Sequence, residues 1–79
     1  MHAAPAKIVP MNEIRVNNKK LRKLSGSKIA QYMRDYDRGD TFPPIVVEDN
    51  GSFYSINDGR HRYQAQLLAG YLTVEVIVR

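Results

Sequence analysis

The stretch that decides the fold is residues 56–65, where a strand, a tight turn and the start of a helix follow one another. It reads Ile56-Asn57-Asp58-Gly59-Arg60-His61-Arg62-Tyr63-Gln64-Ala65. Gly59 has no side chain and would let a ligand approach the backbone. Arg60, His61 and Arg62 then occupy the first turn of the expected helix, where the helix dipole favours acidic residues. A local rule broken in this way marks a candidate functional site.

The chemistry that suits this turn is the binding of an anion. The free amides of a helix start attract phosphate, and we expect Gly59, Arg60, His61 and Arg62 to bind it. His61 is also a candidate for acid–base catalysis near neutral pH. Asp58 would either cap the helix or hold a divalent metal ion beside the phosphate, as a candidate catalytic residue. Two structural alternatives stay open. The arginines could be solvated surface charges, and His61 could be a core histidine whose hydrogen bonds are satisfied within the protein.

Hydrophobic patterns on both sides of this stretch predict the other elements. We expect a helix over 26–38, started by the serines of 24–27 and ended by Gly39. The expected strands are a short edge strand at 7–10, an extended piece at 11–16, a β-branched strand at 45–49 and an alternating strand at 72–78. Two helices over one small mixed sheet make an α+β domain. We assign residues 7–79 to this single domain and residues 1–6 to a flexible tail.

Two patterns predict finer detail. Asn50-Gly51 predicts a two-residue hairpin turn, so residues 52–56 should pair antiparallel with residues 45–49. In the helix that follows Gly59 and ends at Gly70, the expected apolar face contains Ala65, Leu68 and Ala69.

Composition narrows the classes of function. The 79 residues contain no cysteine, which excludes disulfides, thiolate metal sites and cysteine nucleophiles. No apolar run approaches the ~20 residues of a membrane span, and the N-terminus lacks a signal-peptide core, so we expect a cytoplasmic protein. The formal charge of +4 is compatible with a polyanionic partner. A bare sheet edge would also allow a homodimer.

The most basic stretch is residues 17–23. We predict that it contacts a nucleic-acid backbone through Lys19, Lys20, Arg22 and Lys23. The structural alternative is a solvated loop.

The turn and its surroundings resemble a known family. Residues 58–65 are similar to the signature of the ParB/sulfiredoxin-like superfamily, which includes the ParB-like nuclease domain. Residues 44–47 resemble its Pro-Ile-x-Val strand, and the likeness covers about residues 7–79. The resemblance implies a phosphate or nucleotide site, with Gly59, His61 and Arg62 in the phosphate-binding turn and Asp58 at the acidic position of the kinase-like members. The cofactor it implies is CTP, ATP or ADP with Mg²⁺.

Departures from the family pattern limit what carries over. Arg60 stands where a sulfiredoxin needs its reactive cysteine, so sulfinic-acid reduction is excluded. Seventy-nine residues leave no room for the DNA-reading and dimerisation domains of partition proteins, so such partners would lie outside this chain. Only Glu13 is acidic before the first helix, where kinase-like members have a base.

Three functions follow as hypotheses. The first is a nucleotide- or nucleic-acid-binding domain. The second is a metal-dependent nuclease or an ADP/ATP-dependent small-molecule phosphotransferase, with Asp58, His61 and Arg62 as its minimal set. The third is a non-catalytic protein-interaction module.

Overall fold

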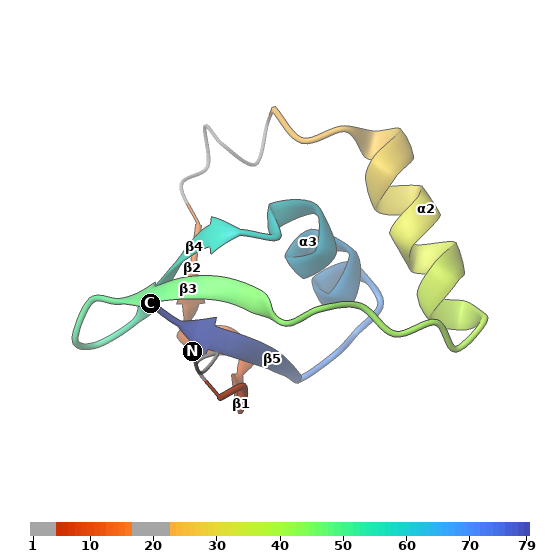
Figure 1. Ribbon diagram of the computed structural model, residues 1–79. Coiled ribbons are helices and arrows are strands. Elements are labelled where there is room, and N and C mark those ends of the chain that lie inside the picture. Colours follow the sequence, from red (N-terminus) through yellow and green to blue (C-terminus); the bar gives the residue numbers. More distant parts are fainter. Residues whose placement is uncertain (1–4, 17–22) are drawn as a thin grey trace.

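The computed structural model describes residues 5–16 and 23–79 and has the expected α+β class. In these residues two α-helices accompany a five-stranded mixed sheet (Figure 1). The elements are β1 (Lys7–Pro10), a 3-10 turn η1 (Met11–Glu13), β2 (Ile14–Arg15), α2 (Gly26–Asp37), β3 (Ile45–Asp49), β4 (Tyr54–Asp58), α3 (Arg60–Leu68) and β5 (Thr73–Val78). Their order is the one that the hydrophobic patterns predict.

The sheet has the strand order β1-β5-β3-β4-β2. The β1–β5 and β3–β4 pairs are antiparallel, whereas β3–β5 and β2–β4 are parallel. β1 lies at an edge, as expected for a strand that ends in Pro10. The centre of the sheet is therefore β5, β3 and β4, and β4 leads directly into the turn at Gly59.

The core lies between this sheet and α3. Its buried hydrophobic residues are Val9, Met11, Ile14, Ile45, Val47, Ile56, Tyr63, Ala65, Val74 and Val76. In β5, Val74 and Val76 are buried while Thr73 and Glu75 are exposed, which is the alternation that a strand with one covered face requires. The packed strands hold the end of β4, and hence the turn at Gly59, in place.

The hairpin between β3 and β4 differs from the prediction. The loop spans residues 50–53 rather than two residues, and β4 pairs through Val47 opposite Ile56 after a register shift. The N–H of Asn50 donates to the carbonyl of Phe53 at 2.9 Å, and the Asp49 carboxylate accepts from the N–H of Gly51. Among the described residues only glycines have positive φ, so Asn50 does not adopt the conformation of a type I′ turn.

The helices also sit differently from the expected pair of helices on one sheet. α3 lies against the sheet, whereas α2 packs on α3 and lies farther out (Figure 1). Every residue of α2 is half-buried or exposed. In α3 the buried residues are Tyr63 and Ala65, while Leu68 is 58% exposed, so the predicted apolar face is correct only at Ala65. The exposed positions, Leu68 and Ala69, lie at the end of α3, after the buried Tyr63 and Ala65.

Residues 1–4 lie outside the described part of the chain, and Pro5 and Ala6 are exposed. The flexible tail over 1–6 thus stays a prediction. In the described ranges, we find no helix with the length and apolar character that crossing a bilayer demands.

Candidate phosphate-binding site

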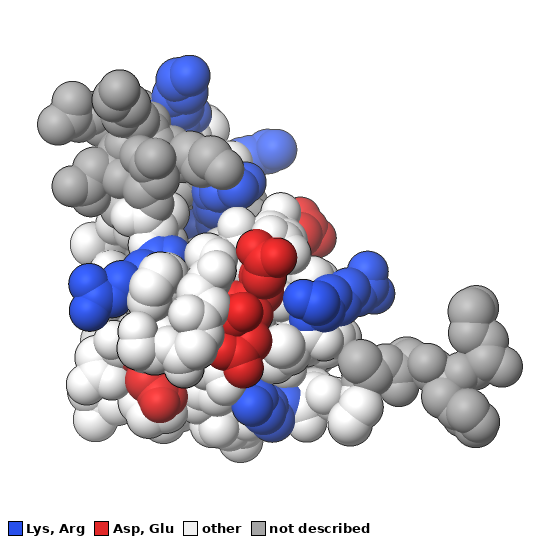
Figure 2. Space-filling view, turned by 90° about the vertical axis from the view of Figure 1, so that its left-hand side faces the viewer, with Lys and Arg blue, Asp and Glu red and all other residues white. Residues whose placement is uncertain are grey.

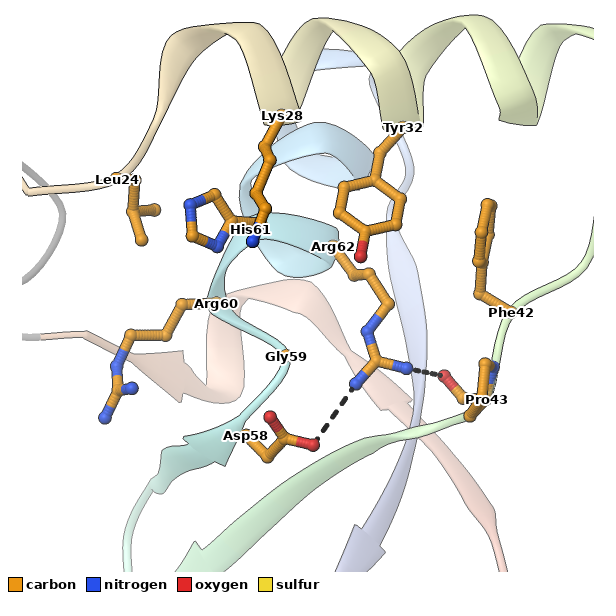
Figure 3. A pocket seen from close by; sticks show the side chains of 10 residues that line it. All are labelled: Leu24, Lys28, Tyr32, Phe42, Pro43, Asp58, Gly59, Arg60, His61 and Arg62. Atoms are coloured by element: carbon orange, nitrogen blue, oxygen red, sulfur yellow. Dashed lines mark hydrogen bonds and ion pairs between the residues drawn. The ribbon is translucent and has the colours of Figure 1, made fainter.

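The first turns of α2 and α3 line the same pocket, which has a volume of about 460 Å³ (Figure 3). The pocket is lined by Leu24, Lys28, Tyr32, Phe42, Pro43, Asp58, Gly59, Arg60, His61 and Arg62. It thus contains each of the residues 58–62 that the sequence singles out. Lys28, Arg60 and Arg62 outnumber Asp58, so the lining carries a positive balance of charge.

Arg62 is held firmly at this pocket. Its Nη1 donates to the carbonyl of Pro43 at 2.8 Å, and its Nη2 lies 3.6 Å from an oxygen of Asp58 (Figure 3). Only 12% of its side chain is exposed, against 78% for that of Asp58. The alternative of a freely solvated arginine is therefore wrong for this position. One carbonyl and one carboxylate orient the guanidinium, so its fork is in place before any ligand arrives.

Gly59 makes this position of Arg62 possible. Its φ of 103° lies in the left-handed region, and a Cβ built on it would stand 2.9 Å from Nη2 of Arg62. The first bond within α3 runs from the N–H of Tyr63 to the carbonyl of Gly59 at 2.9 Å. The amides of residues 60–62 precede that bond. Gly59 is the N-cap residue and has no side chain to offer them, so the interpretation of Asp58 as the cap is wrong.

His61 has a structural task. Its Nε2 accepts a hydrogen bond from the N–H of Ser25 at 3.0 Å, across 36 residues of sequence. A ring nitrogen that accepts carries no proton, so the neutral imidazole has its proton on Nδ1. Ser25 in turn caps α2, because its Oγ accepts from the N–H of Lys28 at 3.3 Å. His61 thereby joins the start of α2 to the start of α3 and is best described as a positioning residue.

Arg60 is oriented away from the other cations. Its Nη2 donates to the carbonyl of Ile56 at 3.2 Å, and Figure 3 shows the guanidinium pointing away from Arg62 and Lys28. In this conformation Arg60 lines the rim of the pocket rather than its centre.

Sequence reasoning missed the five other lining residues, which come from the start of α2 and from the segment before β3: Leu24, Lys28, Tyr32, Phe42 and Pro43. Lys28 stands in the first turn of α2, and this turn has no acidic residue. The same signal, a basic first turn, singled out Arg60, His61 and Arg62 in α3. The rings of Tyr32 and Phe42 meet edge to face, with centroids 5.1 Å apart. No sequence signal pointed to Phe42, because its place depends on α2.

The model of the ParB N-terminal domain family matches residues 2–79. The chain belongs to this family. The match spans both helices and the whole sheet, and it confirms the resemblance to the ParB/sulfiredoxin-like superfamily. Comparison with curated protein sequences found no match.

Solved structures share the fold of this ParB N-terminal domain. Sulfiredoxin from Arabidopsis thaliana is 24% identical with a TM-score of 0.81, over 95% of this chain and 84% of its own. C-terminally truncated chromosome-partitioning protein ParB from Caulobacter crescentus, complexed with CTP-γ-S, is 23% identical with a TM-score of 0.77. The match covers 95% of this chain and 44% of the ParB chain. A free serine kinase in complex with AMP is 12% identical with a TM-score of 0.78. The match covers 99% of this chain and 32% of the kinase chain. The domain thus corresponds to less than half of the ParB and kinase chains.

The remaining predicted residues of this ParB N-terminal domain lie at its surface or outside the described ranges. Lys23 is exposed in the turn before α2, whereas Lys19, Lys20 and Arg22 fall outside the described residues. Figure 2 shows several basic side chains at the upper end of the molecule, the end at which α2 begins, and acidic ones over the middle of the face in view. Nucleic-acid contact through these lysines and Arg22 stays a prediction.

The metal role of Asp58 also stays a prediction. Its carboxylate faces Arg62, and within residues 5–16 and 23–79 no three His, Asp or Glu side chains gather into a potential metal site. A metal ion at Asp58 would take its other ligands from water or from the phosphates of a bound nucleotide.

Proposed function

We propose that this chain binds a nucleoside phosphate in the pocket between α2 and α3. The phosphates would lie against the amides of residues 60–62, within reach of Arg62 and Lys28. The aromatic side of the pocket, formed by Tyr32 and Phe42, would face the sugar or the base. The observation that carries the proposal is the pre-oriented guanidinium of Arg62, whose side chain is largely shielded from solvent, beside a glycine N-cap.

The comparisons support this class of ligand. Structures that share the fold were solved with CTP-γ-S, AMP and ADP. Catalysis would need more than this chain supplies at the pocket, because His61 already uses Nε2 to accept from Ser25 and Asp58 faces Arg62. We therefore place binding before nuclease or phosphotransferase activity as the function of this site.

Calorimetric titration with CTP, ATP, ADP and GTP, with and without Mg²⁺, tests the proposal and identifies the base. A single-stranded oligonucleotide serves as a further arm, since nucleic-acid binding would fall steeply with salt. Lys28→Gln removes an exposed cation from the pocket, and we expect binding about fivefold weaker. Arg34→Gln removes the same charge from the same helix two turns away and is the matched control.

If none of the nucleotides binds at millimolar concentration, the proposal is wrong. It is also wrong if Lys28→Gln and Arg34→Gln weaken binding equally, because the effect then reports net charge alone. A dependence on Mg²⁺ that Asp58→Asn abolishes would support the metal role of Asp58.

A further inference from the structure

A second cavity lies at the other end of α2 and is independent of the phosphate pocket proposal. Its volume is about 390 Å³. Its lining includes Ile8, Tyr36, Asp40, Gln66, Tyr71 and Glu75. We call it the acidic cavity, because Asp40 and Glu75 are the charged residues among these.

The charge of the acidic cavity is opposite to that of the chain. The protein carries a net +4, yet among the described residues neither Lys nor Arg lines this cavity. Asp40 has a half-exposed side chain and lies 3.3 Å from Arg38, which also pairs with Asp35. Glu75 makes no ion pair within the described part of the chain. Its carboxylate is thus available to a ligand from solvent.

The end of α2 adjoins the acidic cavity. α2 ends at Asp37, and Gly39 continues the chain with a φ of 85°. The carboxyl end of a helix carries partial negative charge on its last carbonyl groups and favours a cation nearby. In this chain Arg34 in the last turn and Arg38 at the C-cap are such cations, so the carboxylate left for a ligand is that of Glu75. Asp40 and Tyr36, which line the acidic cavity, flank this end.

Aromatic rings form a further part of the lining. The ring of Tyr36 meets Phe42 at a centroid distance of 5.0 Å and Tyr71 at 5.6 Å. The hydroxyl of Tyr36 accepts a hydrogen bond from the side chain of Gln66 at 2.7 Å, which fixes the ring. Burial raises the pKa of Tyr36, so the hydroxyl stays neutral at physiological pH. Aromatic faces attract cations, and they do so best when the ring is already in place.

We propose that the acidic cavity binds a guanidinium group carried on an aliphatic stem, such as the side chain of arginine. Guanidinium is planar and weakly hydrated, so it can stack on a tyrosine ring while it donates to a carboxylate. Ile8 and Tyr71, which are 70% and 42% exposed, offer apolar surface to the stem. A compact, strongly hydrated ammonium uses this combination less well.

An NMR titration at low salt tests the proposal with acetylarginine amide as the probe. We expect chemical-shift changes at Tyr36, Tyr71 and Glu75, smaller changes with acetyllysine amide, and none there with the uncharged isostere acetylcitrulline amide. A tripeptide, acetyl-Ala-Arg-Ala amide, distinguishes the two sources of the group. Tighter binding of the peptide indicates a partner chain, and equal binding indicates a small molecule.

Variants connect the titration to the carboxylates. We expect Glu75→Gln to weaken binding of acetylarginine amide about three- to fivefold, as for a partly exposed charge pair. Glu48→Gln removes the same charge from an exposed position of β3 outside the cavity and should leave binding unchanged. The proposal is overturned if the citrulline probe shifts the same resonances equally, if Glu75→Gln binds like the wild type, or if the shifts lie away from the cavity.

Discussion

At the scale of single residues, the site depends on the pairing of a glycine with an arginine. Gly59 leaves the space that the guanidinium of Arg62 fills, and Arg62 is fixed by Pro43 and Asp58. The turn therefore has two requirements, a left-handed backbone and room for a side chain three residues later. The other glycines with positive φ, Gly39, Gly51 and Gly70, meet only the first of these.

Gly59→Ala tests whether both requirements act. We expect a loss of about 2–3 kcal/mol in the free energy of unfolding, from left-handed strain and from displacement of Arg62. Gly51→Ala is the matched control: its φ is 93° and a Cβ there would meet nothing within 4 Å. It should lose only about 1 kcal/mol, the strain part. Urea unfolding measures both values, and equal losses would show that the contact with Arg62 has no energetic weight.

Tyr63 gives the protein a dependence on alkaline pH. Burial raises the pKa of Tyr63 in the folded chain, and the side chain is only 7% exposed. The unfolded chain therefore ionises first, near a pH of about 10. The stability that Tyr63 contributes is complete below that pH and is lost as the pH rises through the raised folded value. Tyr63→Phe should thus lose less stability than the wild type between pH 8 and pH 11. Parallel unfolding curves at both pH values measure this, and identical declines would contradict it.

At the scale of elements, α2 is attached to the fold without a buried residue of its own. It packs on α3 rather than on the sheet, and each of its residues keeps some exposure. Two hydrogen bonds join it to α3, one near each end: Ser25 to His61, and Gln66 to Tyr36. Because stability is not uniform in a protein, an element attached in this way opens before the core does.

His61→Ala removes the bond at the start of α2. We expect α2 to lose about 1 kcal/mol of protection, because the N–H of Ser25 loses its acceptor. Hydrogen exchange should therefore quicken in α2 while the amides of β3 and β5, which serve as the internal control, keep their rates. Uniformly faster exchange would mean instead that His61 supports the whole fold.

At the scale of the whole molecule, the two cavities lie at opposite ends of α2. The basic pocket adjoins its amino end and the acidic cavity its carboxyl end. Phe42 lines both. The placement separates opposite charges on a small surface, so an anionic and a cationic ligand could be bound at the same time.

Ligand binding should raise the stability of the whole chain by mass action. A nucleotide present at a hundred times its Kd contributes about 2.7 kcal/mol. For a domain of this size each kcal/mol shifts Tm by roughly 4–8 °C, so we expect a rise of about 10 °C or more. A thermal melt with the nucleotide selected by calorimetry measures the shift. Lys28→Gln should show a smaller rise at the same concentration, and an unchanged Tm in the wild type would contradict binding.

The sequence by itself determined the order of the strands and helices along the chain and the place of the basic turn after Gly59. Alternation in β5 and the helical spacing in α2 report burial locally, and a basic first turn after Gly59 is visible without any structure. The hairpin loop was harder to predict from the sequence. The side chains of Asp49 and Asn50 form hydrogen bonds with the backbone of the turn, and the Asn-Gly pair alone does not reveal them.

Tertiary structure alone decided how the candidate residues are used. His61 turns to Ser25 and Arg62 turns to Pro43, while Lys28 joins the pocket from another helix. These contacts join residues far apart in the chain. Periodicity and local propensity describe neighbours within a few residues, so they are silent about which distant backbone group a side chain will meet.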